Sequence, residues 1–308
     1  MAFQVTLHQM VIFFLILMVG FIVGKTGLFK REQMGGLAQI ITKVLLPVLI
    51  FYATVGSATP QSIAANWFII AFGVVFYIVM ALILFALAKL MRLKGDRDKV
   101  FTFCFLFGNT GFVGVPLLVA LFPESGMLYM MLFSVVDQLV FWTFGIWLAT
   151  ARDRKTRFSA KSLLTPNIIS IVLALVFVVF GIPVPGVVND TLAVISNATS
   201  GMCMIYLGLL VCFSKWTQVV KCKELYVGIA AKMLLLPILG GHLLMAIGGL
   251  SPDAMVSMVV IMSLPVMTVV PMIASMYGNE GEYATGITVV TLVLSVVTIP
   301  LVQLLAFM

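Results

Sequence analysis

Long apolar runs, separated by short polar stretches, dominate this chain from end to end. Each run is close to the roughly 20 residues that a helix needs to cross the hydrocarbon core of a bilayer. The runs are continuous and do not alternate with polar positions, so they predict helices and not the strands of a membrane barrel. We expect ten transmembrane helices, at residues 8–24, 35–56, 66–90, 100–121, 127–150, 164–181, 190–213, 225–248, 254–277 and 283–306.

The composition agrees with a membrane protein and raises one further question. Apolar residues make up 62% of the 308 residues and charged residues only 9%, with a mean hydropathy of +1.21. About a quarter of the residues in an average soluble protein are charged, so a water-soluble fold is excluded. The net charge of +7 could indicate binding to nucleic acid, which makes the placement of the basic residues informative.

The basic residues follow the loops in a regular order. Sixteen of the 18 Lys and Arg residues lie in the loops after the first, third, fifth and seventh predicted spans, and the intervening loops at 57–65, 122–126, 182–189 and 249–253 contain none. Under the positive-inside rule, this alternation places the basic loops in the cytoplasm and both termini outside it. The charge is therefore explained by orientation in a cell membrane, and we expect no nucleic-acid partner.

The two halves of the chain carry similar interruptions at matching places. Pro116 in the fourth span and Pro271 in the ninth are 155 residues apart, against a half-length of 154. Five spans per half is an odd number, so the second half enters the membrane from the opposite face. The pattern predicts an all-α membrane protein with a first five-helix repeat at 1–150, a basic cytoplasmic linker at 151–163 and a second, inverted five-helix repeat at 164–308. Helix four of the first repeat and helix nine of the second are expected to be broken and to cross.

The interruptions supply candidate binding groups. Proline lacks a backbone donor and glycine loosens a helix, so backbone groups inside the membrane need new partners, and half-helix N-termini suit a carboxylate. A close helix-packing face is the alternative reading for either span alone, and the pairing of the two favours a substrate site. The expected substrate-binding residues are Asn109, Thr110, Gly111, Pro116, Gln138, Pro265, Thr268 and Pro271.

Three charged side chains lie well inside predicted spans, away from the span ends, at Lys43, Asp137 and Lys232. Each costs about 2.5–3.5 kcal/mol at mid-membrane on insertion scales, so each is a functional hypothesis by default. One hypothesis is proton exchange at Asp137 or Lys43 during substrate binding, and the other is a structural pair between the acid and a lysine. Gln138, beside Asp137, could contact substrate or hydrogen-bond a neighbouring helix.

Motifs for other chemistry are missing from the sequence. There is no H-E-x-x-H, G-x-S-x-G, Walker or dinucleotide-binding motif, and the four cysteines have no metal-site spacing. We therefore expect neither an enzyme nor an ATP-driven pump, with no catalytic residue, no bound metal and no cofactor.

Several short motifs resemble the auxin efflux carrier family, which includes bacterial malate and malonate permeases and plant PIN-type carriers. The matching stretches are Lys43-Val-Leu-Leu-Pro47, Gly108-Asn109-Thr110-Gly111-Phe-Val-Gly114-Val-Pro116, Gln138-Leu-Val-Phe-Trp142 and Leu264-Pro265-x5-Pro271. The resemblance implies ten helices in inverted repeats, with a scaffold domain and a transport domain whose helix crossing binds an organic carboxylate. It also implies that Asn109 and Gln138 contact substrate, that Lys43 lies near the crossing, and that a homodimer is an expected assembly.

We thus expect a secondary carrier of small organic anions in the cytoplasmic membrane, coupled to H+ or Na+. Its partners would be a mono- or dicarboxylate such as malate or malonate and the lipid bilayer. The alternative is a cation/proton antiporter of similar architecture that uses Asp137. Asp137 is a departure from the plant pattern, so the coupling mechanism stays open between these hypotheses.

Overall fold

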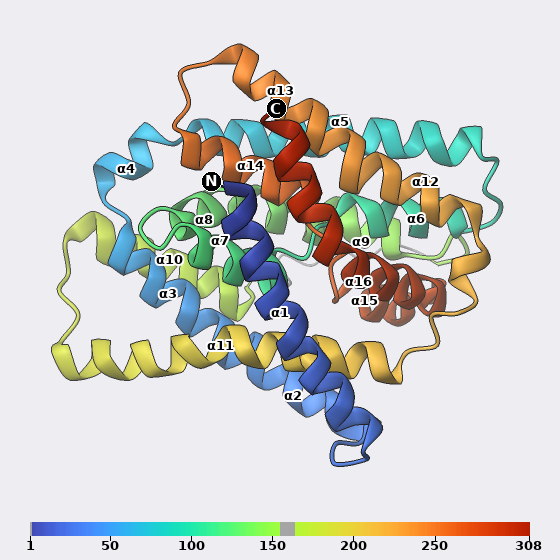
Figure 1. The fold of residues 1–308 in the computed structure, drawn as a ribbon, viewed down its shortest axis with the longest axis horizontal. Helices are drawn as coiled ribbons and strands as arrows, with labels where there is room; N and C mark the ends of the chain where they lie inside the picture. Colours follow the sequence, from blue (N-terminus) through green and yellow to red (C-terminus); the bar gives the residue numbers. More distant parts are fainter. Residues whose placement is uncertain (1, 155–163) are drawn as a thin grey trace.

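The computed structural model describes residues 2–154 and 164–308, and helices account for nearly all of them. No strand occurs in these two ranges, and the expected linker at 151–163 lies outside them from residue 155 onward. The α-helices are α1 (Ala2–Lys25), α2 (Met34–Ile40), α3 (Leu46–Ser57), α4 (Pro60–Ala65), α5 (Phe68–Leu90), α6 (Arg97–Leu106), α7 (Val115–Leu121), α8 (Gly126–Val140), α9 (Ile146–Ala149), α10 (Pro166–Phe180), α11 (Gly186–Phe213), α12 (Lys223–Ile229), α13 (Leu236–Ile247), α14 (Pro252–Ser263), α15 (Val270–Met276) and α16 (Gly281–Ala306) (Figure 1).

Seven helical segments in the described ranges are long and apolar enough to cross a membrane, which confirms an all-helical membrane protein. They are Phe3–Lys25, Arg31–Ser57, Phe68–Leu90, Gly126–Ala149, Gly186–Phe213, Lys223–Ile247 and Gly281–Ala306. The other three expected spans correspond to shorter apolar helices at Thr110–Leu121, Pro166–Phe180 and Pro252–Ser263. Two of these three belong to the spans in which the sequence predicts a break.

Wide π-helical turns interrupt several of the helices. Three of them, at Ile41–Leu45, Thr110–Gly114 and Ala230–Leu235, come just before Pro47, Pro116 and Pro237. A proline ring clashes with the carbonyl four residues earlier, and in each case that carbonyl belongs to the π-turn. The prolines therefore account for the widened turns without ending the helices.

Glycines bring α1 and α11 into backbone contact. A side-chain carbon added at Gly20 would overlap the backbone of Ile205, and one added at Gly208 would overlap the backbone of Leu17. Small residues allow this close approach of helices inside a membrane, where van der Waals packing replaces the hydrophobic drive of water. The two helices form one of the closest seams in the fold.

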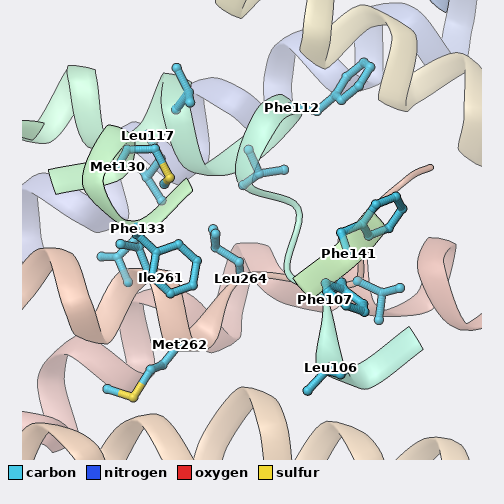
Figure 2. Packing of buried hydrophobic residues seen from close by; sticks show 14 of the residues in the cluster. Leu106, Phe107, Phe112, Leu117, Met130, Phe133, Phe141, Ile261, Met262 and Leu264 are labelled. Carbon is cyan, nitrogen blue, oxygen red and sulfur yellow. The ribbon is translucent and has the colours of Figure 1, made fainter. Parts of the chain in front are cut away.

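The most deeply buried part of the molecule surrounds the short helices of the fourth and ninth expected spans. Most side chains of α6 and α14 are buried. Phe103 and Phe105 of α6, and Phe107 directly after it, have no measurable exposure. Figure 2 shows the apolar side chains that pack around the extended stretch between Phe107 and Phe112. This packing places the two broken helices at the centre of the structure.

Candidate functional site

Two breaks in the helices meet at the centre of the fold. Helix α6 ends at Leu106 and helical structure resumes at Thr110, while α14 ends at Ser263 and α15 begins at Val270. Both interruptions occur in the expected fourth and ninth spans, where glycine and proline residues free the backbone from helical pairing.

The two interrupted segments bond to each other. The backbone N–H of Asn109 donates to the carbonyl of Pro265 at 2.7 Å, and that of Met267 donates to the carbonyl of Phe107 at 3.1 Å. Gly108 and Val266 thereby form an isolated antiparallel bridge. Each break thus supplies partners for the backbone groups that the other has freed, as a buried backbone requires. We call segments 107–110 and 264–268 the crossover.

Asn109 is buried in the crossover and has an unused donor. Its side-chain oxygen accepts from the N–H of Phe112 at 3.2 Å and caps the resumed helix, while the residue is only 1% exposed. Its Nδ2 group has no hydrogen-bond partner among the described residues. A buried unpaired amide donor costs about 1–3 kcal/mol, so this group is a natural point for a ligand acceptor.

Asp137 lies behind the first break and accepts three hydrogen bonds. Tyr77 of α5 donates through its hydroxyl, Thr110 donates at 3.4 Å and the Gln138 amide donates at 3.2 Å. Trp142 in turn donates to the Gln138 oxygen at 3.2 Å. The carboxylate is 0% exposed and lies beside the first residue of a half-helix, where a negative charge is favoured.

Lys232 lies behind the second break. Its ammonium group donates to the carbonyl of Leu264, directly after the C-terminal end of α14, and a carbon added at Gly108 would lie 3.5 Å from its Nζ. A positive charge is favoured at a helix C-terminus. Lys232 is 1% exposed and forms no direct ion pair with Asp137.

Thr268 and Pro271 line a polar cavity of about 230 Å³ beside the crossover. The Thr268 hydroxyl has no partner within the described chain. The other lining residues come from α11, α15 and α16. Tyr206, Ser275, Thr285 and Thr288 carry hydroxyl groups, and Leu210 and Met272 are apolar. A small hydroxyl-lined space of this kind suits a compact polar solute.

The remaining expected residues have different surroundings. Gly111 faces α3, since an added carbon would lie 3.4 Å from the Leu46 Cδ1 atom. Pro116 is buried at the start of α7. Lys43 is exposed on the π-turn between α2 and α3 and forms no ion pair with Asp137.

The sequence reasoning did not include three residues of this region. Tyr77 donates to Asp137, Thr291 accepts from the Val266 N–H at 3.2 Å, and Tyr206 packs against Phe112 with ring centroids 5.2 Å apart. Tyr77 is a polar group in the middle of an apolar span, which is a signal in the sequence. Nothing in the local sequence connects Thr291 or Tyr206 with the breaks.

The ion pairs of the described chain involve residues of the expected cytoplasmic loops and adjoining helix ends. Arg152 contacts Asp98 at 2.5 Å and Asp96 at 3.4 Å, and Arg97 contacts Glu280 at 3.2 Å. The hydrogen bond to Asp98 raises the pKa of Arg152 above its ordinary value. These pairs connect the end of α9 and the start of α6 with the loop before α16.

Long apolar helices with buried charges at a paired break are typical of membrane transporters. The family model described as membrane transport protein matches residues 5–303, and the chain belongs to this family, the auxin efflux carrier family. An uncharacterised transporter of Methanothermobacter thermautotrophicus is 22% identical over 195 residues, which cover 63% of this chain and 64% of that protein. An uncharacterised transporter of Methanocaldococcus jannaschii is 23% identical over a region that covers 67% of this chain and 69% of that protein.

Proposed function

We propose that this protein is a secondary carrier of small organic anions, mono- or dicarboxylates such as malate or malonate, in the cytoplasmic membrane. In this proposal the carboxylate binds at the crossover, and alternating access comes from movement of one half-bundle against the other around the fixed crossover. The polar cavity that Thr268 lines, of about 230 Å³, is of a size suited to such a solute.

The unused donor of Asn109 is the observation that carries the proposal. Its amide Nδ2 is buried, has no partner in the part of the chain that the structure describes, and lies at the start of the Thr110–Leu121 half-helix. A half-helix N-terminus favours negative charge, and an amide N–H donates readily to a carboxylate oxygen. Thr268, on the opposite break, offers a second unpartnered group through its hydroxyl.

The finer architecture is part of the same proposal: ten spans in two inverted repeats of five, with both termini outside the cytoplasm. Matching contacts between the halves support it, because the α1–α11 pairing of spans one and seven has a counterpart in the α10–α3 pairing of spans six and two. Pairs of this kind arise when a second half repeats the first in the opposite orientation. A homodimer remains part of the proposal through the family resemblance.

Coupling to H+ or Na+ is also proposed, and Asp137 is the group on which the alternative function depends. In a cation/proton antiporter this carboxylate would bind the ion, but Tyr77, Thr110 and Gln138 already donate to it. A cation would have to displace these donors before it could bind. The arrangement therefore favours the anion carrier, with Asp137 in support of the break.

Uptake into proteoliposomes tests the proposal. We expect saturable accumulation of a labelled dicarboxylate or monocarboxylate, and sodium-driven proton movement without an organic anion would instead support the antiporter. A panel of organic acids at two pH values, scored by thermal shift, should identify a stabilising carboxylate.

Asn109→Ser is the informative variant, since serine retains the helix cap and lacks the amide donor. We expect it to abolish the thermal shift with little change in the melting temperature of the free protein. Asn189→Ala is the matched control, because Asn189 is exposed near the start of α11. An unchanged response in Asn109→Ser would contradict the proposed site.

A further inference from the structure

One face of α16 carries polar side chains along most of its length. Threonine and serine recur at intervals of three or four residues, which places them on one side of a helix, and a glutamine follows near the helix end. The residues are Thr285, Thr288, Thr291, Ser295, Thr298 and Gln303. Thr285 and Thr288 line the cavity next to the crossover, and Thr291 accepts from the Val266 N–H at the crossover itself.

The two ends of this polar face differ in how their groups are paired. The hydroxyls of Thr288 and Thr291 donate to carbonyls one turn earlier in their own helix, at 2.9 Å each. Thr298 and Gln303 lie nearer the chain terminus, are 8% and 2% exposed, and have no partner for any of their side-chain polar atoms in the described chain. Within the described residues, the unpaired groups of this face thus lie in the half nearer the chain terminus.

A polar group on α1 adds to this region. Thr6 is 0% exposed, and its hydroxyl also lacks a partner within the described residues. Helices α1 and α16 pack together, and both chain ends lie close to each other at this end of the molecule (Figure 1). The unpaired groups on the two helices therefore belong to one end of the fold.

Two cavities open beside these groups. Gln303 lines one of about 350 Å³, and Thr6 lines another of about 320 Å³. Both cavities are also lined by Pro252 and Val256, so they flank the first turns of α14. Water occupies about 30 Å³ per molecule in the liquid, so each space has room for several molecules next to polar groups.

Water in these cavities would supply hydrogen-bond partners for the buried, unpaired side chains. An unsatisfied buried hydroxyl or amide costs about 1–3 kcal/mol, and native structures contain few such groups. The unpaired side chains of Thr6 and Gln303, which line the two cavities, are typical of a hydrated passage, since polar surface at membrane depth is tolerated where it lines water.

We propose that α1, α14 and α16 enclose a hydrated extracytoplasmic access path, with Gln303 and Thr6 at its mouth and Thr291 at the crossover. Water and small polar solutes bearing hydroxyl or carboxylate groups pass along the hydroxyl face of α16. The extracytoplasmic assignment rests on the orientation given under the proposed function. The existence of the path is independent of which solute is carried.

Cysteine labelling tests the path directly. Right-side-out vesicles that contain Thr298→Cys or Gln303→Cys are treated with a charged, membrane-impermeant methanethiosulfonate. The parent chain has four native cysteines, and its labelling is subtracted as background. Val297→Cys is the matched control, because Val297 adjoins Thr298 on α16 and its side chain is 65% exposed on the apolar surface. We expect at least tenfold faster labelling of both path variants, since a thiol surrounded by lipid does not ionise.

Each outcome decides the inference. Equal rates at positions 297 and 298, or no labelling of either path variant, overturns the path. Labelling that occurs only in inside-out vesicles overturns its extracytoplasmic assignment. If both path variants are labelled but the protein accumulates no carboxylate, the access path is supported and the proposed carboxylate transport is contradicted.

Discussion

The two breaks of the crossover have reciprocal backbone hydrogen bonds and opposite electrostatics. Each donates one backbone N–H to a carbonyl of the other. The first break has the carboxylate of Asp137 behind it, beside a half-helix start, and the second has the ammonium of Lys232 behind it, beside a half-helix end. The comparison teaches that each buried charge is opposite in sign to the partial charge of the helix end beside it. Neither residue has a charged counterpart in the other half.

Replacement of Asp137 should have the largest effect on this arrangement. In Asp137→Asn the amide retains one acceptor oxygen where three donors converge, so at least one donor is left unpaired. We expect a loss of about 3 kcal/mol in the free energy of unfolding and a loss of uptake. Unfolding in detergent and proteoliposome uptake measure the two effects. Unchanged uptake with unchanged pH dependence would remove both a coupling and a supporting function for this residue.

Replacement of Lys232 tests the other side of the comparison. Lys232→Met retains the length of the side chain but leaves the Leu264 carbonyl without its donor. We expect destabilisation by about 2 kcal/mol, again by detergent unfolding. Lys89→Met, at an exposed position near the end of α5, is the control and should change little. If both variants behave alike, the charge at the second break has no structural function.

The hydroxyl of Tyr77 provides a smaller and more selective test. Tyr77→Phe removes one of three donors to Asp137 and leaves the aromatic packing against Phe107 and Phe133 in place. We expect destabilisation by about 1 kcal/mol, measured against Tyr52→Phe as a control whose hydroxyl has no such partner in the described chain. A loss as large as that of Asp137→Asn would mean that the tyrosine alone holds the carboxylate.

The smallest effect on stability is expected at Thr268. Its hydroxyl has no partner among the described residues, so Thr268→Val should change the free energy of unfolding by no more than about 0.5 kcal/mol. If the hydroxyl contacts the substrate, the apparent affinity in uptake should fall several-fold. Thr285→Val, on the same cavity but with its hydroxyl bonded to the Gly281 carbonyl, is the comparison. An unchanged affinity in Thr268→Val would restrict substrate contacts to the first break.

Much of the fold could be predicted from the sequence, because apolar runs of membrane-spanning length leave little freedom of interpretation. Seven of the expected spans have a long apolar helix in the structure, and glycine and proline located both breaks. The positions of the breaks follow from local backbone chemistry, which a single sequence contains.

The partners of the buried charges could not be predicted in the same way. Whether Asp137 pairs with Lys43, with Lys232 or with neutral donors depends on helix rotation and depth, and no spacing along the chain fixes either. In the structure Lys43 is exposed, Lys232 bonds to a carbonyl, and Asp137 accepts from Tyr77, a residue 60 positions away. Contacts of this kind arise only from packing between distant helices.

The glycine contact between α1 and α11 sets a mechanical limit on transport. A methyl group at Gly20 or Gly208 would already overlap backbone atoms of the other helix, so these helices cannot slide past each other without separating. In the movement proposed for the carrier, we therefore expect these two helices to stay paired. We expect the proposed movement at contacts made by side chains, such as the contact between Tyr206 of α11 and Phe112 of the first half-helix, whose rings are tilted by 36° with centroids 5.2 Å apart.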